Sequence, residues 1–571
     1  MHFFFVSGIW GNMKKANNRI SGLTVNKMIS LLAALALLAA VCSSCSGEST
    51  QTPVNDDSAE TVDTSGYLVV TGNEPDTVDF QCTSLYYLTA YNSFDRLVET
   101  QSGDDGTPVI VPSLAESWDV SDDGTEYTFH LREGIEFSNG SALTSSDVLY
   151  TFTRLLTHPD SCNGELVAEI AGAPQLMSGE ADTLNGFEII NDTDFTITLT
   201  KPFEAFLLCL SVPGASILDE ETTERAGELF GKGPDNIIGT GPYIMYRWEH
   251  GDRMLFRVNE NWWGGSPAND GLDVRFITDA ETERIMFEDG EIDILDLDDL
   301  GDSAEFFIHG DIYQNRLYDV DRTAISYIAL NESVGPLNDV RVRKALQYSL
   351  DRQLLLDAVY GGRGVVENGI YPHSLIGFDP DLPEIPYDKD RAAALLAEAG
   401  YPDGFTLEVG MRPTSTAYEV SLVRAAASMW KEICIETDIN VMSENEFMKK
   451  RTEGSLACYL GTWAADYYDP DNFIYTFFGS AEKTKYRSLC YSDESVMRRV
   501  RDARSMLDEE ERIKEYRDLE RKIIQDDAAW IPLFSRTRYY VTNSRVSGFR
   551  TDWNGYIEEC YKYYSVEPMQ Q

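Results

Sequence analysis

The stretch Asp123-Gly-Thr-Glu-Tyr127-Thr-Phe-His-Leu131 alternates apolar and polar residues, and Thr144-Ser-Ser-Asp147-Val-Leu-Tyr-Thr-Phe152 follows it closely. Alternation at period two is typical of a half-buried β-strand. A threonine three residues before an acid, ahead of an apolar run, is typical of a capping box that opens a helix. This part of the chain therefore predicts a strand followed by a helix.

The same alternation of strand and helix patterns continues along the chain. Residues 195–200 alternate like a second half-buried strand. Apolar spacing predicts helices over 339–359, 390–399, 493–507 and 509–526, the last capped by Asp508. Short apolar runs predict strands at 67–70, 273–277, 292–297, 327–330 and 407–410. Interleaved strands and helices of this kind indicate the α/β class.

Length and charge narrow the possible functions. At 571 residues, with 43% apolar and 11% aromatic residues, the chain is globular and long enough for two to four domains. Its 47 basic and 95 acidic residues give a net charge of −48. Such a surface repels phosphate backbones and anionic lipid headgroups, which excludes nucleic acid as a partner. Solubility alone also explains the acidity.

The N-terminus reads as an export and anchoring signal over residues 1–45. Residues 28–41 form an apolar run that is too short to cross a bilayer and fits a signal peptide. Small residues then precede Cys45, as in a bacterial lipoprotein signal, where that cysteine carries the lipid; Cys42 is the alternative, and Met13 is an alternative start. Residues 46–66 are polar and are expected to form a flexible tether.

Sequence motifs of common enzymes and metal sites are missing. The sequence holds no HExxH, GxSxG, P-loop or EF-hand pattern, and no histidine lies within five residues of another. The seven cysteines after Cys45 show no CxxC pair or metal spacing, and no disulfide pairing can be assigned. We therefore expect no enzymatic activity, no cofactor and no metal, although a Ser–His–Asp arrangement of distant residues stays open.

One stretch looks like a binding site: Gly461-Thr462-Trp463-Ala464-Ala465-Asp466-Tyr-Tyr-Asp469-Pro470. It places an aromatic residue, small residues and one acid ahead of a turn. A buried cation needs a fixed opposite charge, because burying it unpaired costs several kcal/mol. Asp466 is therefore a candidate for holding a lone cation; the alternative is a turn or helix-cap aspartate.

Several blocks resemble a known family when taken in order. The stretch quoted first, with Pro112-Ser-Leu-Ala-Glu-Ser-Trp118 ahead of it, resembles the signature of the family 5 extracellular solute-binding proteins, the peptide- and nickel-type receptors of ABC importers. Further blocks follow in that family's order: Ile238-Gly-Thr-Gly-Pro-Tyr243, Asn261-Trp-Trp-Gly-Gly265, Phe287-Glu-Asp-Gly-Glu-Ile-Asp293, Pro336-Leu-Asn-Asp-Val-Arg341 and Ala399-Gly-Tyr-Pro-Asp-Gly404. The resemblance covers about residues 67 to 560.

The resemblance implies a two-lobed periplasmic-binding-protein-like fold of the class II type. A hinge joins the lobes, and an extra domain is inserted into the first lobe. On this analogy lobe I holds 67–97, 238–330 and 531–571, the inserted domain holds 98–237, and lobe II holds 331–530. Hinge closure around a ligand gives a shape that a membrane partner can recognise.

The resemblance also implies roles for single residues. Asp466 would pair with the α-ammonium of a peptide, while the backbone around Thr462 and Ala464 would bind the peptide main chain as an added strand. Trp463 either walls the site or packs in the core. Arg412 either binds the ligand carboxylate or is a surface arginine. The segment containing Cys82 and Leu85 resembles the lobe I stretch beside the ligand's N-terminal end.

The sequence thus predicts a lipid-anchored, monomeric receptor on the outer face of the bacterial cytoplasmic membrane. It would bind peptides and deliver them to an ABC permease with its ATPases. A receptor for nickel–chelator complexes or oligosaccharides on the same fold is the alternative, and a secreted hydrolase is a third reading from a different class.

Overall fold

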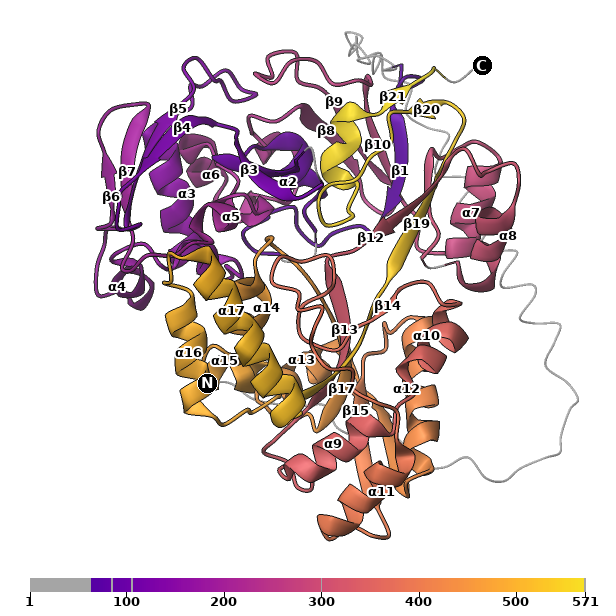
Figure 1. Ribbon diagram of the computed structural model, residues 1–571. Coiled ribbons are helices and arrows are strands. Elements are labelled where there is room, and N and C mark those ends of the chain that lie inside the picture. The colour runs from indigo at the N-terminus through magenta and orange to yellow at the C-terminus, as the bar shows by residue number, and fades with distance from the viewer. Residues whose placement is uncertain (1–62, 84–85, 104–105, 299, 569–571) are drawn as a thin grey trace, which may run out of the picture. The chain divides into compact units, whose positions relative to one another are not determined.

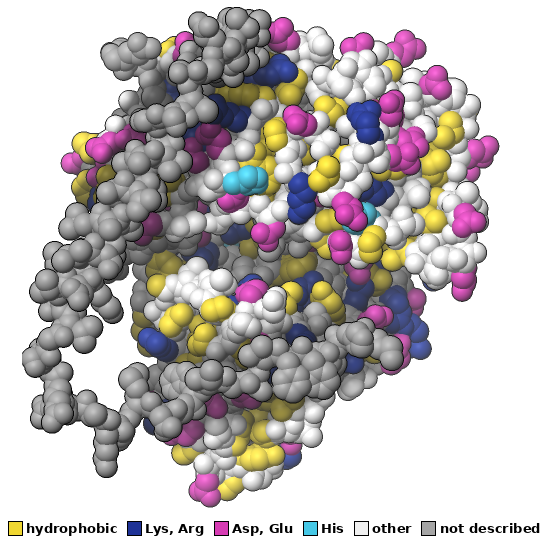
Figure 2. Space-filling view, turned by 180° about the vertical axis from the view of Figure 1, so that it is seen from behind, with side chains coloured by type: hydrophobic (Ala, Val, Ile, Leu, Met, Phe, Trp, Pro, Cys, Tyr) yellow, Lys and Arg dark blue, Asp and Glu magenta, His cyan; other side chains and the backbone are white. Residues whose placement is uncertain are grey.

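The computed structural model describes residues 63–83, 86–103, 106–298 and 300–568 (Figure 1). The predicted signal, the Cys45 that is expected to carry the lipid, and most of the predicted tether lie outside these residues. The strands and helices interleave, which confirms the α/β class, and they form separate sheets that the two lobes and the inserted domain are built on. Figure 2 shows acidic side chains spread over one face, with basic ones among them.

Lobe II is built on a six-stranded sheet of mixed direction. Its strand order is β14 (Val365–Val366), β18 (Trp530–Ser535), β13 (Ala324–Leu330), β17 (Cys458–Ala464), β15 (Phe405–Met411) and β16 (Ile435–Val441). Strand β13 is buried along its whole length: Ile325 and Tyr327 enter the core on one face, and Ile328 and Leu330 the core on the other. A continuous apolar strand is what a sheet covered on both faces requires.

The helices of lobe II cover both faces of this sheet. One core includes side chains of α9 (Val340–Tyr348), α10 (Arg352–Tyr360), α11 (Lys389–Glu398) and α12 (Ala417–Lys431). The other includes side chains of α13 (Glu444–Thr452), α14 (Pro470–Phe478), α16 (Glu494–Ala503), α17 (Glu509–Glu520) and the π-helical turn η6 (Arg521–Asp526). The short α15 (Ala481–Tyr486) packs against α14 and α13.

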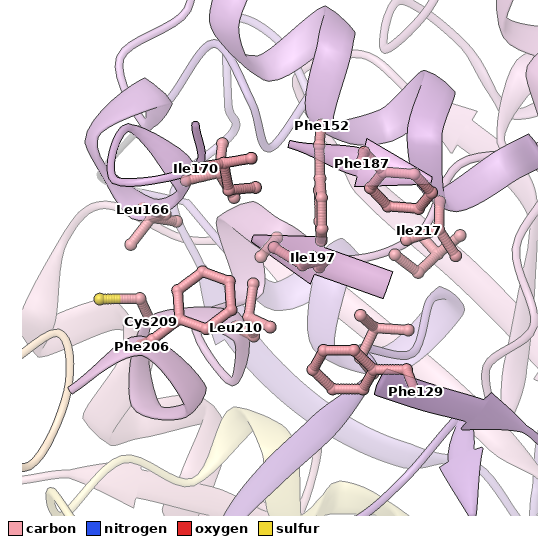
Figure 3. Close-up of a cluster of buried hydrophobic side chains, with 14 of the residues drawn as sticks. Phe129, Phe152, Leu166, Ile170, Phe187, Ile197, Phe206, Cys209, Leu210 and Ile217 are labelled. Carbon is pink, nitrogen blue, oxygen red and sulfur yellow. The ribbon is translucent and has the colours of Figure 1, made fainter. Parts of the chain in front are cut away.

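The inserted domain has a sheet and an aromatic core of its own. Its strand order is β4 (Ala115–Val120), β5 (Glu126–Leu131), β7 (Asp194–Thr198) and β6 (Phe187–Ile189), next to the hairpin of β2 (Val98–Ser102) and β3 (Pro108–Pro112). Phe129, Phe187 and Phe195 stack across neighbouring strands. Figure 3 shows Phe129 and Phe187 with Phe152 of α3 (Ser145–Thr157) in this cluster.

Short helices complete the inserted domain and the start of lobe I. They are α2 (Leu88–Ser93), η1 (Gly164–Val167), α4 (Ala173–Ser178), α5 (Phe206–Leu210), η2 (Pro213–Ala215), α6 (Glu220–Ala226), η3 (Gly227–Leu229) and η4 (Pro234–Asn236). Of these, α2 packs against β8 and against a C-terminal turn of lobe I. Residues 79–83, ahead of α2, are therefore assigned to lobe I, and they also contact Cys162 and Asn163 of the inserted domain.

Lobe I contains two further sheets. One has the order β1 (Leu68–Gly72), β10 (Gly271–Phe276), β9 (Arg253–Val258) and β8 (Tyr243–Glu249), and the other β11 (Ile294–Asp296), β19 (Thr537–Thr542) and β12 (Leu317–Asp321). The remaining elements are α7 (Ala280–Glu288), η5 (Gly301–Ser303), α8 (Ala304–His309), η7 (Glu558–Tyr563) and the β20 (Val546–Ser547)–β21 (Ser565–Val566) pair. Strands from distant parts of the sequence thus share one lobe.

The chain crosses between the lobes at two short connections. Strand β12 of lobe I is followed by β13 of lobe II after Arg322 and Thr323, and β18 of lobe II is followed by β19 of lobe I after Arg536. The expected boundaries at 330/331 and 530/531 place β13 in lobe I and most of β18 in lobe I. The sheet membership of these strands argues for boundaries near 322 and 536, and the full domain division stays a prediction.

Local sequence signals explain most helix starts. The capping box of α3 is present, because Asp147 Oδ2 accepts hydrogen bonds from Thr144 N at 2.9 Å and from Thr144 Oγ1 at 2.8 Å. The single helix expected over 339–359 is wrong. Asp351 caps a new helix by accepting from Leu354 N at 2.9 Å, so α9 and α10 are separate.

A buried ion pair joins α17 to the start of α14. Arg512 donates to both carboxylate oxygens of Asp469, at 2.9 and 2.8 Å, and the two side chains are 4% and 3% exposed. Asp469 also caps α14 through Asp471 N at 2.9 Å. Burial lowers the pKa of Arg512, but the adjacent carboxylate outweighs burial and leaves the pKa raised, so Arg512 stays charged. Burial raises the pKa of Asp469, and the charge and hydrogen bonds of Arg512 offset part of that rise.

Replacing Arg512 with methionine should lower the free energy of unfolding by about 3–5 kcal/mol, because Asp469 is then left charged and buried without a partner. Urea titration at pH 7 measures this. The control is Arg499→Met in the more exposed Arg499–Glu515 pair, which should cost less than about 1 kcal/mol. Equal losses in both variants would contradict the assigned role of Arg512.

Candidate functional site

The candidate site lies where β17 ends and the turn to α14 begins. Asn472, in the first turn of α14, forms hydrogen bonds with Trp463 and Asp466. Its Oδ1 accepts from Trp463 Nε1 at 3.1 Å and from Asp466 N at 3.0 Å, and its Nδ2 donates to Asp466 Oδ2 at 3.1 Å. The connection between β12 and β13 also holds this turn, because Thr323 O accepts a hydrogen bond from Ala465 N at 2.8 Å. The position of Asp466 is therefore fixed from both sides.

Asp466 combines solvent exposure with a raised pKa. The side chain is exposed. Burial in its wider surroundings nevertheless raises the pKa of its carboxyl, and the hydrogen bond from Asn472 and the charge of Arg487 offset only part of this. A group that touches water while dense protein surrounds it gives both results. No ion pair of Asp466 occurs among the described residues.

The helix-cap alternative for Asp466 is excluded by the local geometry, because Asp469 is the N-cap of α14. The two acids that follow are neutralised by arginines in the core. Asp469 pairs with Arg512, and Asp471 pairs with Arg504 at 3.0 Å. Asp466 alone of these three faces solvent, which leaves its charge available to a bound group.

Tyr87 of lobe I lies close enough to this carboxylate for its charge to act on the Tyr87 hydroxyl. Burial raises the pKa of Tyr87, and the charge of Asp466 adds to the rise, so the two groups are near neighbours. The Tyr87 hydroxyl donates to Asn163 Oδ1 at 3.1 Å, in the inserted domain. Asn163 in turn donates to the carbonyls of Phe80 and Thr83, each at 2.9 Å. Asp466 therefore lies near a braced segment of lobe I.

Trp463 lies between the core and Arg487. Its ring makes an edge-on contact with Phe477, with 5.4 Å between ring centroids. The Arg487 guanidinium lies 4.6 Å from the Trp463 ring centroid, a distance typical of a cation–π contact. Arg487 forms no ion pair within the described part of the chain. Trp463 thus packs on one side and carries a cation on the other.

Thr462 and Ala464 lie where one edge of β17 has no strand partner among the described strands. On one side they pair with Ser326 and Ala324 of β13. On the other side the pairing with β15 is limited to Val409–Cys458 and Gly410–Tyr459. Because β15 ends at Met411, the backbone from Gly461 onward has no strand partner on that side.

Arg412 directly follows β15, at the same end of the sheet. Its side chain is 44% exposed, lies 3.6 Å from Glu444, and packs over the ring of Phe447. No contact joins it to Asp466 in the described residues. Cys82 lies on the lobe I segment near Tyr87, and Leu85 lies outside the described residues. Their roles toward a ligand stay predictions.

Sequence reasoning missed three residues of this site. Asn472 lies two residues after the quoted stretch and could have been found as a polar residue at the start of a helix. Tyr87 directly follows the lobe I segment that was singled out. Arg487 had no local signal, since its contact with Trp463 joins residues from separate elements.

Neither a metal-binding cluster nor a membrane-spanning helix occurs among the described residues. No group of three or more His, Cys, Asp and Glu side chains is arranged to hold a metal ion there. None of the described helices is long and apolar enough to cross a bilayer.

Replacing Asp466 with asparagine should increase stability. The folded state raises the pKa of Asp466, so the charged form costs stability above that pKa, and the cost disappears below the unfolded value of about 3.9. In protein refolded from urea, Asp466→Asn should show a higher free energy of unfolding at pH 7, with the gain shrinking towards pH 4. Asp469→Asn, which breaks the buried ion pair, should be less stable. A loss of stability in Asp466→Asn would contradict this.

Comparison with known proteins places the chain in a family. Residues 109–485 match the family described as bacterial extracellular solute-binding proteins, family 5 Middle. The chain is 28% identical to heme-binding protein A of Haemophilus influenzae over 491 residues, 82% of this chain and 87% of that protein. It is also 28% identical to the dipeptide-binding protein of Escherichia coli K12 over 497 residues, 83% and 89%.

Solved structures share the fold. The periplasmic binding protein DppA of Helicobacter pylori, in complex with the peptide STSA, superimposes with a TM-score of 0.74 at 23% identity, covering 88% of this chain and 98% of that one. This supports the two-lobed periplasmic-binding-protein fold expected from the sequence. The match over most of the chain identifies it as a member of the family 5 bacterial extracellular solute-binding proteins.

Proposed function

We propose that this protein is an extracytoplasmic receptor that binds short peptides between its lobes and delivers them to an ABC import permease. One observation carries the proposal. Asp466 is a solvent-exposed carboxylate with a raised pKa and no ion pair among the described residues, and its charge acts on Tyr87 of the other lobe. Such a group gains most from a ligand that brings a positive charge. A peptide's α-ammonium is that charge.

The charge of Asp466 separates peptides from other ligands of this fold. Haem and chelated nickel complexes carry carboxylates, which Asp466 repels, and an oligosaccharide brings no charge to pair with it. Hydrogen bonds between a carboxylate and a cation are about twice as strong as neutral ones. An ammonium ligand therefore fits the site better than the alternatives do.

The backbone of β17 offers the second part of the site. Beyond Gly461 its edge has no strand partner on the β15 side, so an extended peptide can add as a strand beside Thr462 and Ala464. This mode binds the main chain and tolerates many side chains. Trp463 would wall the ammonium end, and Arg412, at the end of β15, would meet the carboxylate end.

In the proposed function, ion pairs between lobe II and the inserted domain belong to a closed arrangement that holds the ligand. Lys483 and Arg504 of lobe II pair with Glu165 and Glu169 of the inserted domain, each at 2.6 Å. A ligand that contacts both Asp466 and the Tyr87 segment would stabilise this closed arrangement, which the permease can recognise. ATP would be hydrolysed by the ATPases bound to the permease, and this chain would catalyse no reaction.

The N-terminal sequence supports anchoring at the membrane. Cys45 would carry the lipid after removal of the signal, and residues 46–66 would tether the binding domain to the outer face of the cytoplasmic membrane. The domain would act as a monomer. Mass spectrometry of small molecules released by denaturing the purified protein tests the ligand class. Intact peptides support the proposal; haem, sugars or shortened digestion products would overturn it.

Replacing Asp466 with alanine should weaken binding of a released peptide by about 30- to several-thousand-fold, or about 2–5 kcal/mol. N-acetylation of the same peptide removes the ammonium and should cost the wild type as much. Because both changes remove one interaction, combining them should add little. Isothermal titration calorimetry measures all four combinations.

The matched control is Asp438→Ala, an exposed acid on β16 of the same sheet, which should change affinity less than about twofold. Losses below threefold for both Asp466→Ala and the acetylated peptide would reject the ammonium assignment.

Affinity should fall at both ends of the pH range. On the acid side, protonation of Asp466 removes the anion, and because its pKa is raised the loss begins at a higher pH than for an ordinary aspartate. On the alkaline side, the free peptide loses its charge near its own pKa of about 8. An N-acetylated peptide should lose the alkaline limb. A profile that is flat from pH 5 to 9 would count against the ion pair.

A further inference from the structure

Two cysteines lie on the segments that brace Tyr87. The lobe I segment 79–83 runs against the loop after α3 in the inserted domain, and several hydrogen bonds join them. Cys162 N donates to Gln81 O at 3.0 Å, and Asn163 Nδ2 donates to the carbonyls on either side of this contact. Cys162 therefore donates to the residue that directly precedes Cys82, although the two cysteines lie 80 positions apart in the sequence.

The backbone spacing allows a disulfide once the two side chains turn from their present partners, Gln81 O for Cys162 Sγ at 3.6 Å and His158 Nδ1 for Cys82 Sγ at 3.3 Å. With Cys162 N held on the carbonyl that precedes Cys82, standard bond lengths keep the two Cα atoms within about 7 Å of each other. Disulfides usually join Cα atoms about 4.4–6.8 Å apart. Cys162 is exposed and Cys82 is half-buried, so a reagent can reach the pair. Both residues lie in loops, where small backbone shifts are tolerated.

A histidine lies beside one thiol. Cys82 Sγ is 3.3 Å from His158 Nδ1, and the same Nδ1 accepts from Asp160 N at 3.3 Å. A nitrogen that accepts hydrogen bonds can also accept the thiol proton. This matters because burial and the charge of Asp79 raise the pKa of Cys82 to about 12, which makes its thiolate scarce at neutral pH.

We propose that Cys82 and Cys162 are a site of oxidative modification, at which an organic disulfide converts the two thiols into one disulfide that links lobe I to the inserted domain. Members of this family act outside the cytoplasm, where such oxidants persist. The described residues provide no metal-binding cluster here, so thiol chemistry rather than metal binding is the use that the pair supports.

The reaction balances with the organic disulfide as oxidant. Burial raises the pKa of the Cys162 thiol, so the small thiolate fraction of this exposed residue attacks one sulfur of the oxidant, forms a mixed disulfide and releases one thiolate. Cys82 gives its proton to His158 and attacks the Cys162 sulfur, which forms the protein disulfide and releases the second thiolate. Two electrons pass from the protein thiols to the oxidant, and the two protons end on the released thiols.

The bond would stiffen one wall of the proposed ligand site. Asn163, next to Cys162, holds the Tyr87 hydroxyl, and the charge of Asp466 acts on Tyr87. A covalent link at this point limits motion of the segment before ligand arrives, which lowers the entropy lost on binding. This consequence rests on the proposed function, whereas formation of the bond does not.

The test uses the exported chain, treated with oxidised glutathione and then alkylated, digested without reductant and examined by mass spectrometry. We expect a linked peptide pair containing Cys82 and Cys162 that disappears after reduction. Oxidation should raise the melting temperature by about 4–8 °C. Cys162→Ser should abolish both effects, while Cys434→Ser, at another exposed cysteine, should leave both unchanged.

His158→Gln separates the two chemical steps. It should leave glutathione addition at Cys162 unchanged but slow closure to the protein disulfide about tenfold or more, so the mixed disulfide accumulates. Two results would overturn the proposal: both cysteines remain fully alkylated after oxidation of the wild type, or glutathione stays on Cys162 without ever forming the linked pair. Neither result bears on whether Asp466 binds peptides.

Discussion

The bidentate ion pair between Asp469 and Arg512 fixes the turn on which the site depends. It ties α17 to the first turn of α14 below the surface, and Asp469 caps α14 at the same time. Asn472 lies in the first turn of that helix, and its side chain forms hydrogen bonds with Trp463 and Asp466. The Asp466 carboxylate is therefore held in position by buried groups, without an ion pair of its own among the described residues.

Three acids within six residues have two kinds of partner. Asp469 and Asp471 each receive an arginine from a later helix, whereas Asp466 receives only an amide. An amide can orient a carboxylate but cannot neutralise it, so the energetic cost of that charge remains in the folded protein. Functional groups are often kept in such unfavourable states, because the ligand then relieves the cost. Arg504 and Arg512 thus pair with Asp471 and Asp469, whereas the charge of Asp466 stays available to a ligand in the proposed function.

Local signals predicted the fold well and the site in part. Alternation and capping residues located strands such as β5 and helices such as α3, because these signals lie within a few neighbouring residues. The break between α9 and α10 was missed although Asp351 marks it, since apolar spacing continues across the cap. Asp466 was chosen from its own neighbourhood, and its role toward a ligand stays a prediction. The contact between Trp463 and Arg487 was not found, because it depends on how separate elements pack.

Arg504 shows how the site and the closed arrangement share one side chain. Its Nε lies 3.0 Å from Asp471, beneath the site turn, while its Nη1 reaches Glu169 of the inserted domain at 2.6 Å. The guanidinium also stacks on Tyr475 of α14, 3.6 Å from the ring centroid. Separating the inserted domain from lobe II must break the contact with Glu169 and leave Arg504 with Asp471 alone. In the proposed function, a ligand that held the lobes together would keep both contacts, so binding at Asp466 and closure at Arg504 would reinforce each other through the same turn.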